Sequence, residues 1–266
     1  MIALPHRFGA YELTELVGAG STANVYRAQR NGDEVAVKVF RLEATEGPDF
    51  RDRFRREAMV FSALDHPNIV RMLDWGVNEP TCYLVFEFVR GKLLRDKMGA
   101  DRPPAPQALR LLAQIFEGMG YAHEKGIVHR DLRPSKLLVT DSGWLKILDF
   151  GLTRLQNSTL TPPGTAIGTP VYAAPEQLQA EKVDGRADQY ALGVITYELL
   201  AGRLPWTEQG YRALLNRKLE GEPDPPGDGV SPAVAAVIAQ MLAKDPQARY
   251  PDLASALMAL RIAANS

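Results

Sequence analysis

The 266-residue sequence predicts an α+β fold with two lobes, a β-rich N-terminal lobe and a larger, mostly helical C-terminal lobe. Two observations predict this division. Up to about residue 88, apolar residues alternate over short runs, as they do in strands. From about residue 105 they recur every three or four positions, as they do on one face of a helix. We therefore predict one domain over 1–266, with an N-lobe at about 1–88 and a C-lobe at about 89–266.

The N-lobe is predicted to be a sheet with one helix. Runs bounded by turn residues predict strands over 11–17, 24–30, 33–40, 69–75 and 82–88. The pair Asn31-Gly32 between two of these runs is a strong signal for a tight hairpin turn. A charged helix is predicted over 50–64, because its few apolar side chains fall on one helical face.

The C-lobe is predicted to begin with a helix near residue 105, since Pro104 and Pro106 are tolerated around the first turn. Helical spacing predicts further helices over 187–201, 211–220, 231–243 and 252–262. A stretch rich in proline, glycine and threonine occupies residues 153–171. Because loops of this length inside a compact domain are usually functional, we expect a role for it.

Charge and composition exclude several classes of function. The formal net charge is −1 and no basic patch occurs, so nucleic-acid binding is not expected. No apolar run reaches the 18 residues of a membrane span, and residues 1–9 lack the apolar core of a secretory signal. Cys82 is the single cysteine, which excludes an internal disulfide bond. We therefore expect a domain of the reducing cytoplasm.

A glycine-rich turn is the first candidate for phosphate binding. It consists of Gly18-Ala19-Gly20-Ser21-Thr22-Ala23-Asn24-Val25 and joins two predicted strands. Glycine lets backbone N–H groups approach phosphate oxygens without a Cβ in the way. Such a sequence is more often only a turn. Because a strand rather than a helix follows it, it is not a dinucleotide-binding motif.

Lys38 is the second candidate. In Val35-Ala36-Val37-Lys38, the alternation of a strand places Lys38 on the same face as Ala36. A lysine in this setting is usually a solvated edge residue, but beside a phosphate-binding turn its ammonium could contact the α- and β-phosphates. Glu57 in the predicted helix could hold it by an ion pair, although alone Glu57 suggests only a surface charge.

Three short motifs follow in order, namely His129-Arg130-Asp131, Asp149-Phe150-Gly151 and Ala174-Pro175-Glu176. One such triplet can arise by chance, but three in this order after the glycine turn and the lysine strand hardly can. Together they make the sequence resemble the protein kinase family from about residue 11 to 262. The short segment before the third motif and residues 188–193 are most similar to bacterial Ser/Thr kinases.

The resemblance implies a two-lobed kinase fold and transfer of the γ-phosphoryl group of ATP to Ser or Thr hydroxyls of a protein substrate. It implies that Asp131 orients the substrate hydroxyl or accepts its proton. Asp149 would bind Mg²⁺, with Mn²⁺ as a substitute, across the β- and γ-phosphates. Lys38, paired with Glu57, and Arg133 would contact the phosphates of ATP.

The resemblance also implies an ATP-binding set. Val25, Ala36 and Leu138 would enclose the adenine, and Glu87 and Val89 would offer it backbone hydrogen bonds. The complete expected set is Val17, Gly18, Ala19, Gly20, Ser21, Thr22, Ala23, Asn24, Val25, Ala36, Lys38, Glu87, Val89 and Leu138.

Regulation and substrate class are further implications of the resemblance. Thr165 is the first expected phosphosite, followed by Thr161 and Thr159, although a loop that is simply polar is the alternative. A phosphate there could pair with Arg130 and order the segment, and autophosphorylation would bring two copies together as a homodimer. The Ala174-Pro175-Glu176 segment favours a protein substrate over a small-molecule one.

Some motif residues are expected to be structural. Glu176 would pair with Arg249 near the end of the chain. Asp188 would brace the loop that carries Asp131 from the helix beneath it.

Two positions depart from the family pattern. Ala23 replaces the third glycine of the turn and adds one methyl group. Lys136 stands five residues after Asp131, where the family has an asparagine that binds a second metal ion. An ammonium has no lone pair and cannot bind a cation. Either Lys136 disables transfer, leaving a nucleotide-binding or scaffolding pseudokinase, or its charge replaces part of the second metal and one ion on Asp149 suffices.

Overall fold

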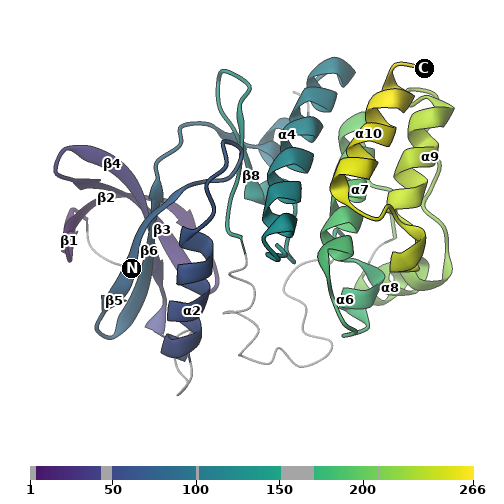
Figure 1. The fold of residues 1–266 in the computed structure, drawn as a ribbon. Helices are drawn as coiled ribbons and strands as arrows, with labels where there is room; N and C mark the ends of the chain where they lie inside the picture. Colours follow the sequence, from purple (N-terminus) through teal and green to yellow (C-terminus); the bar gives the residue numbers. More distant parts are fainter. Residues whose placement is uncertain (1–3, 43–49, 100–101, 151–170, 209) are drawn as a thin grey trace. The chain divides into compact units, whose positions relative to one another are not determined.

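The computed structural model describes residues 4–42, 50–99, 102–150, 171–208 and 210–266. The chain forms two compact units, of which the first extends from the N-terminus to Arg90 and the second begins at Gly91. The first unit is built on a sheet and the second is mostly helical, which confirms the predicted α+β class (Figure 1). The change of unit lies close to the predicted lobe boundary at about residue 88.

The first unit is built on a six-stranded antiparallel sheet in the order β1-β2-β3-β4-β6-β5. Its strands are β1 (His6–Phe8), β2 (Tyr11–Ala19), β3 (Ala23–Arg30), β4 (Asp33–Phe40), β5 (Met72–Asn78) and β6 (Thr81–Glu87). Asn31 and Gly32 join β3 to β4 with φ angles of 52° and 92°. Positive φ at both central positions is what a two-residue hairpin of this type requires, so the predicted turn is confirmed.

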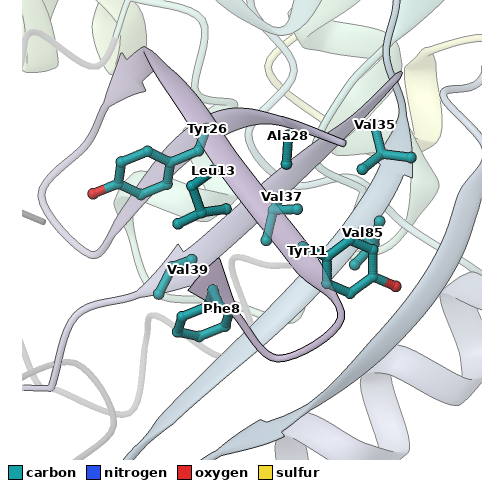
Figure 2. Close-up of a cluster of buried hydrophobic side chains, with 9 residues drawn as sticks. All are labelled: Phe8, Tyr11, Leu13, Tyr26, Ala28, Val35, Val37, Val39 and Val85. Atoms are coloured by element: carbon teal, nitrogen blue, oxygen red, sulfur yellow. The ribbon is translucent and has the colours of Figure 1, made fainter. Parts of the chain in front are cut away.

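Strand β4 has two chemically different faces. Val35, Val37 and Val39 are almost fully buried on one face. They pack in a core whose other members are Phe8, Tyr11, Leu13, Tyr26, Ala28 and Val85 (Figure 2). Burial of each valine contributes about 1.5–3 kcal/mol. Because side chains alternate along a strand, Ala36 and Lys38 lie on the other face.

Helix α2 (Phe50–Ser62) packs its apolar face against this sheet. Phe54 is fully buried, and its ring lies edge-on to Phe40 and Trp75 at centroid distances of 5.7 and 6.0 Å. Asp52 in the first turn places a negative charge near the positive end of the helix dipole. The helix ends two residues before the predicted position.

The second unit combines a small sheet with helices. Its strands β7 (Lys92–Leu93), β8 (Leu137–Val139) and β9 (Leu145–Ile147) pair in that order. The longer helices are α4 (Ala105–Glu124), α7 (Gly185–Ala201), α8 (Tyr211–Glu220), α9 (Pro232–Met241) and α10 (Leu253–Ala264). Short elements are α3 (Leu94–Lys97), α6 (Pro175–Leu178) and the 3-10 turns η1 (Pro134–Lys136) and η2 (Pro246–Ala248). Helices α4, α7, α9 and α10 pack against one another (Figure 1).

Helix α7 is buried on nearly all sides and forms the centre of the second unit. The side chain of Asp184 accepts a hydrogen bond from the backbone N–H of Arg186 and caps its first turn. Gly202, with a φ of 75°, ends it in the left-handed conformation that glycine adopts without strain. Asp184 and Gly202 therefore define the two ends of α7.

The structure corrects some predicted boundaries. The strand predicted over 69–75 was misplaced, since β5 begins at Met72. Residues before it form a turn, in which the amides of Asn68 and Ile69 donate to the side chain and carbonyl of His66. Strands β1, β7, β8 and β9 were not predicted, because two or three residues carry too little alternation. Each helix that lies within the described residues is too short or too polar to cross a bilayer.

Candidate active site

The predicted site residues divide between the two units. The glycine-rich turn joins β2 to β3, where Gly18 faces Val25 and Ala19 faces Asn24. The N–H of Gly20 donates to the carbonyl of Ala23 at 2.9 Å and closes the turn. A Cβ built on Gly20 would lie 3.0 Å from that same carbonyl oxygen, so this position favours glycine. Val17, Ala19, Gly20 and Ser21 are exposed, Thr22 and Asn24 are half-buried, and Ala23 is buried at the start of β3.

Lys38, Ala36 and Val25 share one face of the sheet. Val25 on β3 lies directly opposite Lys38 on β4, and Ala36 is two residues from Lys38 on the same strand. The Lys38 side chain is only 6% exposed, which is rare for a lysine unless it serves a partner. Glu57 is half-buried on α2. The face predicted from the alternation is confirmed, and the ion pair between Lys38 and Glu57 stays a prediction.

The end of β6 and the residues after it hold the predicted adenine-binding backbone. The N–H of Glu87 donates to the carbonyl of Arg71 at 3.0 Å, and the Glu87 carboxylate accepts from the N–H of Arg71 at 3.0 Å. Val89 is half-buried two residues further on. Arg90 then donates to the carboxylate of Glu34 at 2.9 Å. Adenine binding by Glu87 and Val89 stays a prediction.

Leu138, the predicted adenine neighbour in the second unit, lies on β8 beside Gly91. A Cβ on Gly91 would lie 2.5 Å from the carbonyl oxygen of Val139 and 2.7 Å from the side chain of Leu138. Only glycine lets the backbone approach β8 this closely. Gly91 was not predicted as a site residue, because only the folded structure reveals this close approach.

Asp188 on α7 binds the backbone of the loop between α4 and β8. Its carboxylate accepts the backbone N–H groups of His129 and Arg130, both at 2.7 Å. It also lies 2.8 Å from Nε2 of His123. Burial alone would raise the pKa of this carboxyl, but these contacts outweigh it and lower the pKa. The bracing role predicted for Asp188 is therefore confirmed.

The His129 ring links the loop that carries Asp131 to the loop that carries the predicted metal ligand Asp149. Its Nδ1 accepts the N–H of Asp131 at 3.3 Å, and its Nε2 lies 3.0 Å from the carbonyl oxygen of Leu148. An imidazole that accepts at Nδ1 and donates at Nε2 fits the neutral tautomer. The ring also packs on Phe150 at a centroid distance of 5.0 Å. One side chain thus fixes the residue before Asp149 relative to Asp131.

The predicted catalytic carboxylate Asp131 and the predicted metal ligand Asp149 each have a cation nearby. The half-buried Asp131 lies 3.2 Å from the guanidinium Nε of Arg133. Asp149 accepts from the ammonium of Lys136 at 2.5 Å. The backbone of Asp149 has a φ of 60°, a conformation that non-glycine residues adopt at some cost and that occurs often at functional sites.

The β8–β9 hairpin explains why Lys136 meets Asp149. Leu137 pairs with Ile147, and the next bond outward joins the N–H of Leu148 to the carbonyl of Lys136 at 2.8 Å. The register therefore brings the residues just outside the strands together. Among the described residues, no group of three His, Cys, Asp or Glu side chains is arranged to hold a metal ion by itself. A metal here would need further oxygen ligands, such as those of a nucleotide.

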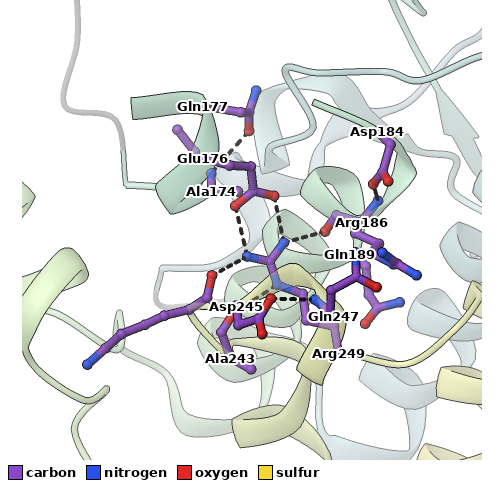
Figure 3. Close-up of polar contacts among 12 residues, drawn as sticks. Ala174, Glu176, Gln177, Asp184, Arg186, Gln189, Ala243, Asp245, Gln247 and Arg249 are labelled. Atoms are coloured by element: carbon purple, nitrogen blue, oxygen red, sulfur yellow. Dashed lines mark hydrogen bonds and ion pairs between the residues drawn. The ribbon is translucent and has the colours of Figure 1, made fainter. Parts of the chain in front are cut away.

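The predicted pair of Glu176 and Arg249 is confirmed. The guanidinium binds both carboxylate oxygens at 2.7 and 2.9 Å, and both side chains are at most 5% exposed (Figure 3). Its remaining N–H groups donate to the carbonyls of Ala243, Arg186 and Lys244 at 2.8–3.2 Å. All five N–H groups of Arg249 are thus used, which joins α6 to the start of α7 and to the turn after α9.

One buried cation in this unit was not predicted. Lys218 on α8 is 1% exposed and donates to two backbone carbonyls. The predicted phosphosites Thr159, Thr161 and Thr165 lie outside the described residues, as does Gly151.

Known proteins are similar to this chain over most of its length. The chain matches the family described as protein kinase domain over residues 11–259. It is 36% identical over 262 residues to the serine/threonine-protein kinase PknB of Mycobacterium leprae, a match that covers 94% of this chain and 42% of the relative. It is 40% identical over 270 residues to the serine/threonine-protein kinase Pkn1 of Myxococcus xanthus, with 97% and 38% covered. The chain therefore spans less than half the length of these relatives.

A solved structure is also similar over the whole length of this chain. The crystal structure of the Mycobacterium tuberculosis PknI kinase domain is similar to this chain with a TM-score of 0.79 and 27% identity, and the match covers 100% of both chains.

Proposed function

This chain belongs to the protein kinase family, and from that membership we propose that it transfers the γ-phosphoryl group of ATP to serine or threonine hydroxyls of protein substrates. The contacts of Asp131 and Asp149 carry the proposal. Both carboxylates lie on loops joined through one histidine ring, and each has a cation within 3.2 Å. Phosphoryl transfer needs positioning and neutralised charge rather than covalent help, and this arrangement supplies both.

Asp131 would orient the substrate hydroxyl and accept its proton as the hydroxyl oxygen bonds to the γ-phosphorus and the bond from that phosphorus to the leaving ADP breaks. Its backbone is fixed by the bond to His129, and the backbone of that residue is in turn bonded to Asp188. A base fixed in this way loses little entropy when the substrate arrives. Arg133, at 3.2 Å from Asp131, would contact the transferred phosphoryl group, where a guanidinium can bind two oxygens.

Each unit carries residues of the predicted ATP-binding set. In the first unit, the turn at Gly18–Val25 and the ammonium of Lys38 would bind the phosphates, and Ala36 would contact the adenine. In the second unit, Leu138 would pack on the adenine.

The donor set fits one Mg²⁺ or Mn²⁺ held mainly by the nucleotide. Such an ion supplies positive charge to the phosphate oxygens, and protein sites usually give it one or two carboxylates. Asp149 provides a carboxylate that can accept more than one contact, one of which is the ammonium of Lys136. We propose that Lys136 contributes the charge that a second metal supplies in the family pattern, so that a single ion on Asp149 suffices.

The pseudokinase alternative rests on the same contact. If the Lys136 ammonium occupies Asp149 too strongly, the carboxylate cannot bind a metal ion. The chain would then bind nucleotide without transferring phosphate, or act only as a scaffold. A thermal shift with ATP, measured with and without Mg²⁺, gives a first distinction, because a ligand that binds the folded state raises the melting temperature.

The first experiment measures transfer of radiolabelled γ-phosphate to the chain itself and to a generic basic protein. Asp131→Asn should lower the rate about 10²- to 10⁴-fold, as expected for the loss of a positioned base. Asp141→Asn, in the exposed turn of the β8–β9 hairpin, is the control and should leave the rate unchanged. An unchanged rate in Asp131→Asn would refute the proposed role.

The second experiment varies Mg²⁺ at a fixed concentration of ATP. The wild-type rate should saturate once ATP is complexed, because one ion suffices. Lys136→Asn should need a further, higher concentration of Mg²⁺ to reach its maximum, since it restores a ligand and removes a charge. Lys182→Asn, at an exposed lysine, is the control. Identical Mg²⁺ curves for wild type and Lys136→Asn would contradict the single-metal proposal. An inactive wild type with an active Lys136→Asn would favour the pseudokinase.

We also propose regulation by phosphorylation. Phosphorylation of Thr165, Thr161 or Thr159 by a second copy would activate the chain, and mass spectrometry after incubation with ATP would identify the site. Alanine at all three threonines should abolish the activation without abolishing ATP binding.

A further inference from the structure

Helix α8 contributes an unexpected side chain to the interior of the second unit. Only Leu214 and Lys218 of its ten residues are buried, and Lys218 is 1% exposed. Lysine is almost never buried to this extent unless its ammonium is paired. The groups that the Lys218 ammonium contacts should therefore explain why it is buried.

The Lys218 ammonium binds the backbone of one short segment and the faces of two rings. It donates to the carbonyls of Val171 and Ala173 at 2.7 and 2.6 Å. It also lies 5.0 Å from the ring centre of Tyr190 and 4.8 Å from that of Trp206, and these rings stack on each other. Carbonyl oxygens and ring faces both favour a positive charge. The ammonium thus ties α8 to residues 171–173.

Segment 171–173 continues into residues that bind the loop between α4 and β8, which carries Asp131. The N–H of Ala174 donates to the side-chain oxygen of Gln177, and the amide nitrogen of Gln177 donates to the carbonyl of Arg130 at 2.9 Å. Arg130 is the residue before Asp131. A protein chain that presents a hydroxyl to Asp131 must therefore pass close to this segment.

The same segment is fixed from a second helix. The hydroxyl of Tyr172 donates to the carboxylate of Glu198 on α7 at 2.6 Å. Glu198 fixes a side chain of the segment, whereas Lys218 fixes two of its carbonyls. Both carbonyls are bonded to one ammonium, so its loss would release the backbone on both sides of Tyr172.

We propose that Lys218 is a positioning residue that holds the backbone of segment 171–173 in the shape needed to receive the protein substrate. This inference rests on the proposed function and adds to it a determinant of protein-substrate binding that lies outside the ATP site. The contacts of Lys218 described above are with segment 171–173, Tyr190 and Trp206, none of which belongs to the predicted ATP-binding set. Its substitution should therefore affect the protein substrate and leave ATP binding unchanged.

The kinetic test compares Lys218→Met with wild type on a generic basic protein at about pH 6, below the pKa of about 7 that burial gives Lys218, so that the wild-type side chain is an ammonium. Methionine keeps much of the apolar stem and removes the ammonium. We expect the KM for the protein to rise about tenfold, as the loss of two charged hydrogen bonds can produce, while the KM for ATP stays within about twofold. Lys218→Gln keeps an N–H donor without the charge and should give an intermediate KM.

Lys244→Met is the matched control. Lys244 also donates to a backbone carbonyl of α8, that of Glu220 at 2.9 Å, but its side chain is 36% exposed and it does not hold segment 171–173. This variant should keep both KM values. A protein KM unchanged in Lys218→Met, or raised equally in Lys244→Met, would overturn the inference.

A second measurement does not depend on activity. Amide hydrogen exchange followed by mass spectrometry should show exchange at residues 171–174 at least about tenfold faster in Lys218→Met, with α7 unchanged. Lys218→Gln serves if Lys218→Met does not fold. Unchanged exchange in this segment would overturn the positioning role even if the protein KM rose. If wild type transfers no phosphate, the proposed function fails, and the exchange result alone decides whether Lys218 fixes the segment.

Discussion

The buried pair of Glu176 and Arg249 gives the sharpest prediction for stability. Glu176→Gln changes one oxygen to nitrogen and keeps the shape of the side chain, but it leaves the Arg249 guanidinium without a counter-charge. The Arg249 side chain is 0% exposed, so water cannot replace the lost partner. Breaking a buried pair from one side typically costs about 3–5 kcal/mol. The three carbonyl bonds of Arg249 remain in the variant, so the guanidinium stays buried and the cost is not avoided.

The measurement is the free energy of unfolding from urea denaturation followed by tryptophan fluorescence. Glu176→Gln should lose about 3–5 kcal/mol, which corresponds to a fall in melting temperature of about 6–20 °C for a chain of this size. The control is Glu117→Gln, which breaks a pair with Arg261 of similar length, 2.9 Å, whose side chains are about half exposed. Exposed pairs contribute only about 0–1 kcal/mol.

A double variant tests the physical reason for this loss. Glu176→Gln combined with Arg249→Met removes both charges, so its loss should be smaller than the sum of the two single losses. A loss below about 1 kcal/mol in Glu176→Gln, equal to that of the control, would refute the reasoning from burial.

Three further predictions concern the second unit. Asp188→Asn should lower kcat in the γ-phosphate transfer assay, because an amide cannot accept all the N–H groups that the carboxylate accepts at His129 and its neighbour; an unchanged kcat would contradict the bracing role. Gly91→Ala should raise the KM for ATP, because the new methyl group would lie 2.5 Å from the carbonyl of Val139; an unchanged KM would show that β8 can move aside. Burial lowers the pKa of Lys218 to about 7, against an opposing effect of Glu176, so the unfolded state binds a proton above pH 7 that the folded state has lost. The free energy of unfolding of wild type should therefore rise relative to Lys218→Met between pH 7 and 9, and a constant difference in urea denaturation would contradict this sign.

The fold was predictable where one physical pattern dominates. Strand β4 alternates valine with other residues, and the Asn31-Gly32 turn fixes the register of its hairpin with β3. The start of β5 was mispredicted because Ile69 is buried like a strand residue, but its N–H closes a turn by donating to the carbonyl of His66. Short strands such as β7 exist only through pairing with distant residues, which local patterns do not reveal.

Site residues were predictable where they belong to motifs with a characteristic order and spacing in the sequence. The contact between Lys136 and Asp149 was not predicted as an ion pair, because it depends on the register of the β8–β9 hairpin. Lys218 was missed for a similar reason. A lysine four residues after Leu214 shares its helical face, but only the carbonyls of residues 171 and 173 make burial of that ammonium favourable.

The two faces of β4 restrict how this part of the gene can change. A single inserted or deleted residue between the Asn31-Gly32 turn and Lys38 would exchange the faces, exposing the valines and turning the lysine into the core. A substitution on one face changes either the packing of the core or the surroundings of Lys38, whereas a shift of one residue changes both. Variation among natural relatives should therefore appear along β4 as replacements, and changes of length should be confined to the turns at its ends.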